Sequence, residues 1–246
     1  GGALAFPLNL SLNNVAAHYT PTIADATTVR AGDLLKVDIG AHVDGYIADS
    51  AFTWCSEKHE LIAAVEAVIA AAVKAVRPGL TVGELSEVIS GAAAAQGVGI
   101  IANLTGHGLD RWQFHAEPTI PNARSGSKRA LELGEVIAIE PFVCSGGGSV
   151  VEGSPVEIFR VVQEKPVRSP EGREILKRMG HGLPFAKRWL ADLGAVKVAL
   201  ALRELERTGA VESYPPLPER SGKLVAQAEH TLIVEEKPVV TTALKE

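Results

Sequence analysis

The segment Leu34–Phe52, LLKVDIGAHVDGYIADSAF, is the feature that most constrains the fold of this chain. Its apolar residues alternate as they do in β-strands, and Asp44-Gly45 at its centre is a strong turn signal. The segment therefore predicts a β-hairpin. Asp38 and Asp49 fall at similar distances on either side of the turn, so we expect them to face each other across the strand pair.

Two carboxylates within apolar strands repel each other and lose hydration, which costs free energy unless a cation or a shared proton relieves them. An alternative is that one aspartate caps a turn while the other pairs with Lys36. For a single aspartate we would prefer that interpretation. Two aspartates at matched positions instead favour a bound cation, whose remaining ligands must come from elsewhere in the chain.

Composition narrows the class of protein. The 246 residues allow one large domain or two small ones, and 46% hydrophobic with 22% charged residues is ordinary for a globular protein. A net charge of −5 gives no reason to expect nucleic acid or an anionic membrane as a partner. Cys55 and Cys144 form neither a metal-type spacing nor a disulfide framework, so we expect a cytoplasmic protein.

The apolar run Leu61–Val76 contains Glu66 and Lys74, which favours an Ala-rich helix over a membrane span.

Two helices are predicted after the hairpin. The first begins at Ser56 or Glu57 and ends near Arg77, before a Pro-Gly pair. The second covers Thr81–Gln96, because Thr81 and Glu84 have the spacing of a capping box.

A change in composition marks residues 169–209, which contain three short helical patterns with basic residues. We expect an inserted helical subdomain there, within a main domain formed by residues 1–168 and 210–246. A winged-helix DNA-binding unit is the alternative. It is disfavoured because the segment has no stacking aromatics and the chain no basic excess.

Histidines supply further candidate ligands. His107 and His115 lie in Asn103–Asn122, which its glycines and prolines predict to be a loop. Each could simply be held by a backbone carbonyl. Because the two histidines flank Trp112 and Phe114, we instead expect this segment to form one wall of a binding site, a binding wall. His18 on its own would be a core or capping residue.

Two glutamates complete the set. Glu140 lies within the predicted strand Glu135–Phe142, and Glu229 within the predicted strand Lys223–Val234. Four carboxylates and an imidazole suit hard or borderline divalent ions, and two such ions balance four negative charges where one does not. We therefore expect two divalent ions about 3.5–4 Å apart, as in other two-metal hydrolytic sites.

Six segments in order resemble successive motifs of the type II methionine aminopeptidases: AFPLNLSLNNVAAHYTP, KVDIGAHVDGYIAD, NLTGHGL, HAEPTIPN, IAIEPF and AEHTLIV. Their order and spacing match over essentially the whole chain, including the helical insertion. The resemblance implies a pita-bread fold, an α/β fold with a curved antiparallel sheet in two pseudo-symmetric halves. It also implies removal of the initiator methionine from nascent chains, some of them on the ribosome, whose second residue is small. We expect an archaeal-type, monomeric enzyme that binds neither nucleic acid nor membranes.

The resemblance also implies five metal ligands: Asp38, Asp49, His107, Glu140 and Glu229. Asp49 and Glu229 would bridge two ions. Asp38 would chelate one ion, and His107 with Glu140 would bind the other. Co, Mn, Fe and Zn all suit such ligands, so the identity of the ions stays open.

Catalytic and substrate-binding roles follow from the same resemblance. Glu140 matches the residue that shuttles the proton of the bridging solvent. His18 and His115 match two histidines that contact the scissile peptide and steady the tetrahedral intermediate. The apolar pocket for the methionine side chain would be formed by Phe6, Phe114, Phe142 and Tyr214.

Two other proteins of this fold are alternatives. A prolidase or aminopeptidase P typically has a large domain ahead of this one, and we expect none here. A binding protein that has lost its metals would have replaced the ligands, whereas all five positions here are acidic or histidine. The resemblance also includes a helical segment ahead of the first motif, which the sequence lacks.

Overall fold

The hairpin predicted from the sequence is present in the structure, a computed structural model. Strands β4 (Leu35–Val43) and β5 (Tyr46–Trp54) pair antiparallel along their whole length. Asp44 and Gly45 between them have φ angles of 51° and 87°. Positive φ at both central residues is what a two-residue turn of the primed type requires. A Cβ on Gly45 would also lie 2.5 Å from the Trp112 indole, so only glycine fits there.

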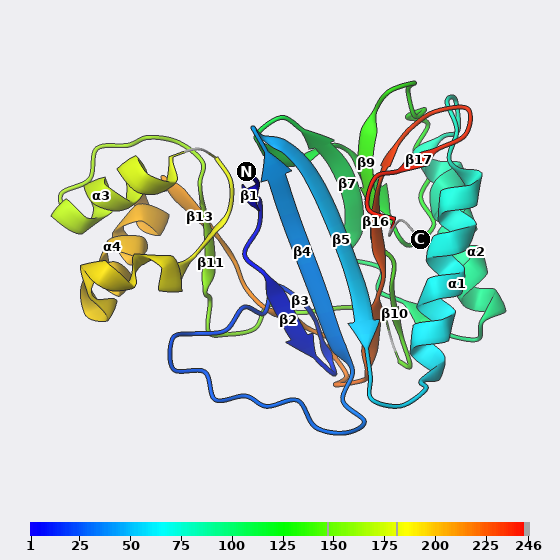
Figure 1. The fold of residues 1–246 in the computed structure, drawn as a ribbon, viewed down its shortest axis with the longest axis horizontal. Coiled ribbons are helices and arrows are strands. Elements are labelled where there is room, and N and C mark those ends of the chain that lie inside the picture. The colour runs from blue at the N-terminus through cyan, green and yellow to red at the C-terminus, as the bar shows by residue number, and fades with distance from the viewer. Residues whose placement is uncertain (147, 181, 244–246) are drawn as a thin grey trace.

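The hairpin belongs to a nine-stranded antiparallel sheet within residues 1–146, 148–180 and 182–243, which the structure describes. Figure 1 shows this sheet between two groups of helices. Its strands run in the order β1 (Ala3–Leu4), β4, β5, β16 (Glu229–Ile233), β9 (Val136–Ile139), β7 (Thr105–Asp110) and β8 (Gln113–Pro121), with β2 (Asn9–Leu12) beside β4 and β17 (Val239–Val240) beside β16.

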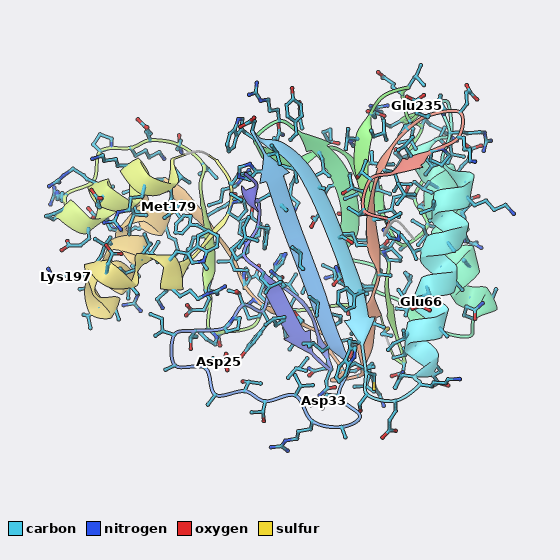
Figure 2. All side chains as sticks on the ribbon, viewed as in Figure 1. Asp25, Asp33, Glu66, Met179, Lys197 and Glu235 are labelled. Carbon is cyan, nitrogen blue, oxygen red and sulfur yellow. The ribbon has the colours of Figure 1, made fainter. Side chains whose placement is uncertain are left out.

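Short strands surround the main sheet. One small sheet is formed by β15 (Val225–Gln227), β10 (Phe142–Cys144) and β6 (Gly99–Ile100), and another by β14 (Leu217–Pro218) and β3 (Val15–Ala17). A long connection leads from β3 to β4 and carries Asp25 and Asp33, labelled in Figure 2.

Helices α1 (Glu60–Ala75) and α2 (Val82–Ala95) cover one side of the sheet and enclose the largest hydrophobic core. The predicted capping box is confirmed: Glu84 N donates to Thr81 Oγ1 at 3.2 Å, and Thr81 N donates to Glu84 Oε2 at 2.8 Å. The first helix begins later than predicted, because His59 rather than Ser56 accepts a hydrogen bond from its first turn. None of the described helices is long and apolar enough to cross a membrane.

The three helical segments expected within residues 169–209 are present at the other end of the sheet (Figure 1). They are α3 (Pro170–Met179), the 3₁₀ segment η1 (Lys187–Leu193) and α4 (Ala195–Thr208), which pack on the small sheet β11 (Ile158–Val161), β12 (Phe185–Ala186) and β13 (Val211–Tyr214). These elements share a hydrophobic core of their own. Figure 2 shows Met179 and Lys197 on this helical group and Glu66 on α1, across the sheet.

The prediction that Asn103–Asn122 is a loop is wrong. This segment forms the hairpin β7–β8, so His107 and His115 both lie on strands. Its glycines serve close packing rather than chain reversal: a Cβ on Gly106 would lie 2.4 Å from the backbone oxygen of Ala138 on the next strand.

Both glutamate-bearing strands are interrupted. Glu140 follows the last residue of β9 instead of lying inside it, and Glu229 begins β16 after a break at Ala228. These breaks place both carboxylates at strand ends, where the backbone can turn toward a common centre.

Lys36 does not pair with either aspartate of the hairpin. Its ammonium group is fully buried and donates to the backbone oxygens of Asn13 at 2.8 Å and Val225 at 3.1 Å. The alternative in which Lys36 neutralises one of the two aspartates is therefore wrong.

Candidate metal centre and active site

Asp38 and Asp49 lie on the same face of the β4–β5 hairpin. Asp38 is opposite Ala51 and Asp49 is opposite Gly40, so the two carboxylates are diagonal rather than directly opposed. Ala51 is also opposite Glu229 on β16. The small alanine side chain therefore leaves space among three carboxylates that three adjacent strands present on one face.

Two more ligand candidates join this face from β7 and the end of β9. Ligand atoms of Asp49, His107 and Glu229 all lie within 4.8 Å of one another. His107 Nε2 is 3.8 Å from Asp49 Oδ2 and 3.5 Å from Glu140 Oε1. The structure thus brings these four side chains together, beside Asp38.

Several oxygen atoms of this cluster are buried without a hydrogen-bond donor. Asp49 and Glu229 are 3% and 2% exposed, and Asp49 Oδ1 and both carboxylate oxygens of Glu229 have no hydrogen-bond partner among the residues that the structure describes. Buried polar atoms are otherwise almost always paired, because an unpaired one costs about 1–3 kcal/mol. Unpaired carboxylate oxygens facing a histidine nitrogen fit divalent cations well.

His107 has the tautomer that a metal ligand needs. Its Nδ1 lies 3.0 Å from the backbone oxygen of Gly108, and a carbonyl can only accept, so Nδ1 carries the proton and Nε2 has a free lone pair. Burial lowers the pKa of His107 to about 4, which keeps the ring neutral near pH 7. A neutral imidazole oriented by a backbone carbonyl is the usual ligand form.

The carboxylates hold protons more tightly than usual. Burial raises the pKa of Asp38 to about 6, although a hydrogen bond from Gln227 opposes this. The pKa values of Asp49, Glu140 and Glu229 are raised well above the usual range, first by burial and then by the neighbouring negative charges. Cations would relieve both causes.

Metal-free Glu229→Gln is expected to be more stable than the metal-free wild type at about pH 8 and to lose that advantage as the pH falls to about 4. Because the pKa of Glu229 is raised in the folded state, protonated Glu229 adds to the free energy of unfolding. This contribution is complete only below the unfolded-state pKa of about 4.3 and is lost as pH rises through the folded-state pKa. Glutamine resembles the protonated acid at every pH. Thermal melts of chelator-treated protein measure the difference, and equal melting temperatures at pH 8 would contradict the burial of an unrelieved charge.

A cavity of about 400 Å³ adjoins the cluster at His107 and Glu140. Its lining includes His18, His107, His115, Glu140 and Phe142. The rings of His107 and His115 are 4.6 Å apart, edge to face. The two histidines that the sequence singled out beside the ligands therefore share one cavity with them.

Three of the four predicted pocket aromatics pack together beside this cavity. Phe6 lies 4.9 Å from Phe114 and 5.5 Å from Tyr214 between ring centroids. Phe142 is buried in a neighbouring core cluster and reaches the cavity separately. The Trp112 ring lies 4.8 Å from that of His42 on the β4–β5 hairpin.

His18 occupies an unusual backbone conformation. Its φ angle is 63°, and its N–H donates to Asn9 Oδ1 at 2.6 Å. Burial lowers its pKa to about 4, partly offset by the hydrogen bond of its ring to the Pro215 oxygen. Burial and the charges of His107, His18 and Arg160 also lower the pKa of His115. Both rings are therefore neutral near pH 7.

Two residues that support the cluster were not found from the sequence. The side-chain amide of Gln227 donates to Asp38 Oδ2 at 3.0 Å. Thr231 Oγ1 accepts from Asp49 N at 2.7 Å and donates to Asp49 O at 2.8 Å. Gln227, Glu229 and Thr231 are polar at every second position of an apolar segment, and that spacing is the signal that could have revealed them.

Comparison with known proteins agrees with this geometry. The model of metallopeptidase family M24 matches residues 2–183. The chain belongs to this family. A methionine aminopeptidase of Thermococcus onnurineus is 45% identical over 251 residues, which cover 98% of this chain and 84% of the relative. The chain is therefore a metallopeptidase enzyme, and the family resemblance predicted from its motifs is confirmed.

Solved structures show the same fold at low sequence identity. A thermophilic Arx1 superposes with a TM-score of 0.82 at 18% identity, covering 96% of this chain and 74% of the other. The methionine aminopeptidase of Thermotoga maritima superposes with a TM-score of 0.67 at 22% identity, with the same coverage. The predicted pita-bread fold is confirmed.

Proposed function

We propose that this chain is a dinuclear-metal methionine aminopeptidase that removes the initiator methionine from nascent proteins whose second residue is small. The observation that carries the proposal is the cluster of unpaired buried carboxylates and a neutral histidine, two members of which, His107 and Glu140, line a cavity. Such a donor set suits metal-assisted hydrolysis, and the relatives named methionine aminopeptidase support the substrate class.

Five residues would hold the two ions: Asp38, Asp49, His107, Glu140 and Glu229. The bound ions would supply Lewis acidity and acidify a solvent nucleophile. Asp49 and Glu229 are the most buried carboxylates of the set and are oriented by β5 and β16, which suits them to a shared position. Gln227 would hold Asp38, and the Gly108 carbonyl would hold His107.

Proton transfer would fall to Glu140 and substrate contacts to the histidines. Glu140 lines the cavity beside His107, where its carboxylate could take a proton from the solvent nucleophile and return it to the leaving amine. His115, neutral and on the cavity wall, can donate a hydrogen bond to the developing oxyanion. The ring N–H of His18 faces the Pro215 carbonyl, so its other ring nitrogen can accept a hydrogen bond from the scissile peptide.

Peptides beginning with Met are expected to be cleaved faster than those beginning with Leu. Walls formed by Phe6, Phe114, Phe142 and Tyr214 would accept the flexible thioether, whereas a branched side chain of similar volume would fit poorly. A misfit of methylene size reduces kcat/KM by about 10–200-fold. Rates for Met-Ala, Leu-Ala, Met-Gly and Met-Lys peptides measure this. The last should be slow, because His18 and His115 crowd the second residue.

The test of the proposed function is hydrolysis of a Met-Ala-Ser peptide by metal-stripped protein after addition of Co, Mn, Fe or Zn. Activity that returns with a divalent ion and requires an N-terminal Met supports the proposal. Equal rates on all four peptides above would indicate a broader aminopeptidase. A preference for Xaa-Pro peptides would indicate a prolidase.

The arrangement of the chain is also part of the proposal. Residues 169–209 would be a helical insertion in a catalytic domain formed by residues 1–168 and 210–246. The separate core of the helical group supports this division. We expect a cytoplasmic monomer that acts on nascent chains. Gel filtration and activity on ribosome-bound chains measure these two properties.

A further inference from the structure

Strand β11 has one face toward the helical insertion and one toward the active site. Phe159 and Val161 belong to the core of the insertion. Ile158 instead packs in the cluster that contains Phe6 and Phe114. Because side chains alternate along a strand, Arg160 points to the same side as Ile158.

The neighbouring strand places a partner beside each of these residues. Ile158 is opposite Tyr214, and Arg160 is opposite Glu212. Residues opposite each other in a ladder share a face. Arg160 and Glu212 therefore lie on the same face of the sheet as Ile158 and Tyr214, two residues farther from them along each strand.

Among the described residues, the guanidinium of Arg160 has a hydrogen-bond partner at Nε but not at its two terminal nitrogens. Its Nε donates to Glu212 Oε1 at 2.7 Å, and the Tyr214 hydroxyl donates to the same oxygen at 2.7 Å. The two terminal nitrogens also form no ion pair with any residue that the structure describes. The side chain is 27% exposed, so part of it reaches solvent.

The same contact connects Arg160 to a candidate catalytic histidine. Tyr214, held by Glu212, stacks on His115 with ring centroids 5.8 Å apart. The free end of the guanidinium thus lies next to the place where the substrate peptide would pass.

We infer that Arg160 is a specificity-determining residue that binds a carboxylate of the peptide substrate beyond the scissile bond. The inference rests on the proposed function. One same-face step along a strand is about 7 Å, which an extended peptide spans in two residues. With the second residue against His115, the side chain of the third or fourth would reach Arg160. A fixed guanidinium with free terminal N–H groups is well suited to a carboxylate.

The test compares amidated tetrapeptides that differ only in charge at one position. Met-Ala-Asp-Gly is paired with Met-Ala-Asn-Gly, and Met-Ala-Gly-Asp with Met-Ala-Gly-Asn. Wild-type enzyme loaded with its activating ion is expected to show about fivefold higher kcat/KM for at least one acidic peptide over its neutral partner, the size of a partly exposed ion pair. The ratio should fall as salt is raised.

Variants assign the preference to this residue. In Arg160→Met the ratio of kcat/KM for the acidic peptide to that for its neutral partner should fall to about one or below, because the negative charge of Glu212 is then no longer neutralised. Arg160→Lys should keep part of the preference, because lysine retains the positive charge. In Glu212→Gln the ratio should rise, because the amide oxygen can still accept from Arg160 and Tyr214 without competing for its charge. Arg178→Met, a surface arginine paired with Glu174 and Asp192, should leave the ratio unchanged.

Each outcome decides the inference. An acidic preference that Arg160→Met removes and Glu212→Gln strengthens supports it. Equal rates for both pairs of peptides in the wild type, or a preference that Arg160→Met leaves intact, overturns it. If Arg160→Met does not fold, Arg160→Lys and Glu212→Gln still give opposite expected shifts. Cleavage of the neutral peptides reports on the proposed function separately, so failure of one is distinguishable from failure of the other.

Discussion

Asp49→Asn is expected to reduce turnover to less than about one thousandth of the wild-type rate and to lower the metal content. The variant removes the negative charge of a residue that is 3% exposed and lies between the carboxylates of Asp38 and Glu229. Loss of a residue that merely orients a ligand costs about 10–100-fold, so loss of a ligand itself should cost more. An amide also has one oxygen in place of two, and it cannot bridge two cations as a carboxylate does.

The measurement combines kcat/KM on a Met-Ala-Ser peptide with metal analysis of each purified variant. Asp192→Asn is a matched control, because Asp192 is an exposed aspartate paired with Arg178 on the helical group. The control should retain both activity and metal. Asp49→Asn with near-normal activity and two bound ions would show that the ligand assignment is wrong.

Local sequence signals predicted the elements that need only neighbouring residues. The turn at Asp44-Gly45 and the capping box of Thr81 and Glu84 are complete within a few positions, and both are present. The three helical segments between residues 169 and 209 were found for the same reason. The start of α1 was missed, because a histidine rarely caps a helix and His59 does so here.

Features that depend on long-range contacts were predicted less well. Asn103–Asn122 reads as a loop because its glycines resemble turn residues, yet Gly106 is required by the close approach of Ala138 on another strand. The diagonal arrangement of the two aspartates depends on the register of the hairpin. The partner of Asp38 lies two residues from Asp49, and a shift of two residues keeps both side chains on one face, so alternation alone cannot detect it.

The support of the site was the least predictable. Gln227 contacts Asp38 from 189 positions away in the chain. The pair of Arg160 and Glu212 joins β11 and β13, between which the helices α3 and α4 lie in the chain. Contacts of this kind leave no local pattern in the sequence. A carboxylate in an apolar strand can be recognised from the sequence, because its burial costs free energy and therefore requires an explanation.

His115→Ala is expected to keep the metal content of the wild type and to lower kcat by about 10²–10³-fold, the usual cost of removing one donor to a developing oxyanion. His115 lines the cavity beside His107, and its pKa lies well below the usual value, so the ring is a neutral donor at pH 7. Metal analysis separates the two roles that a histidine could have here. Loss of an ion from His115→Ala would make it a ligand.

The companion variant for His18 should be His18→Asn, not His18→Ala. The φ angle of 63° at this position disfavours alanine, whereas asparagine tolerates it, so a fall in activity then reflects the lost ring and not a distorted backbone. His59→Asn is the matched control, since an asparagine oxygen can replace Nδ1 as the cap of α1.

If His18 and His115 act on one peptide group, the double variant should lose less activity than the product of the single losses. Fully multiplicative losses would place the two rings on independent steps.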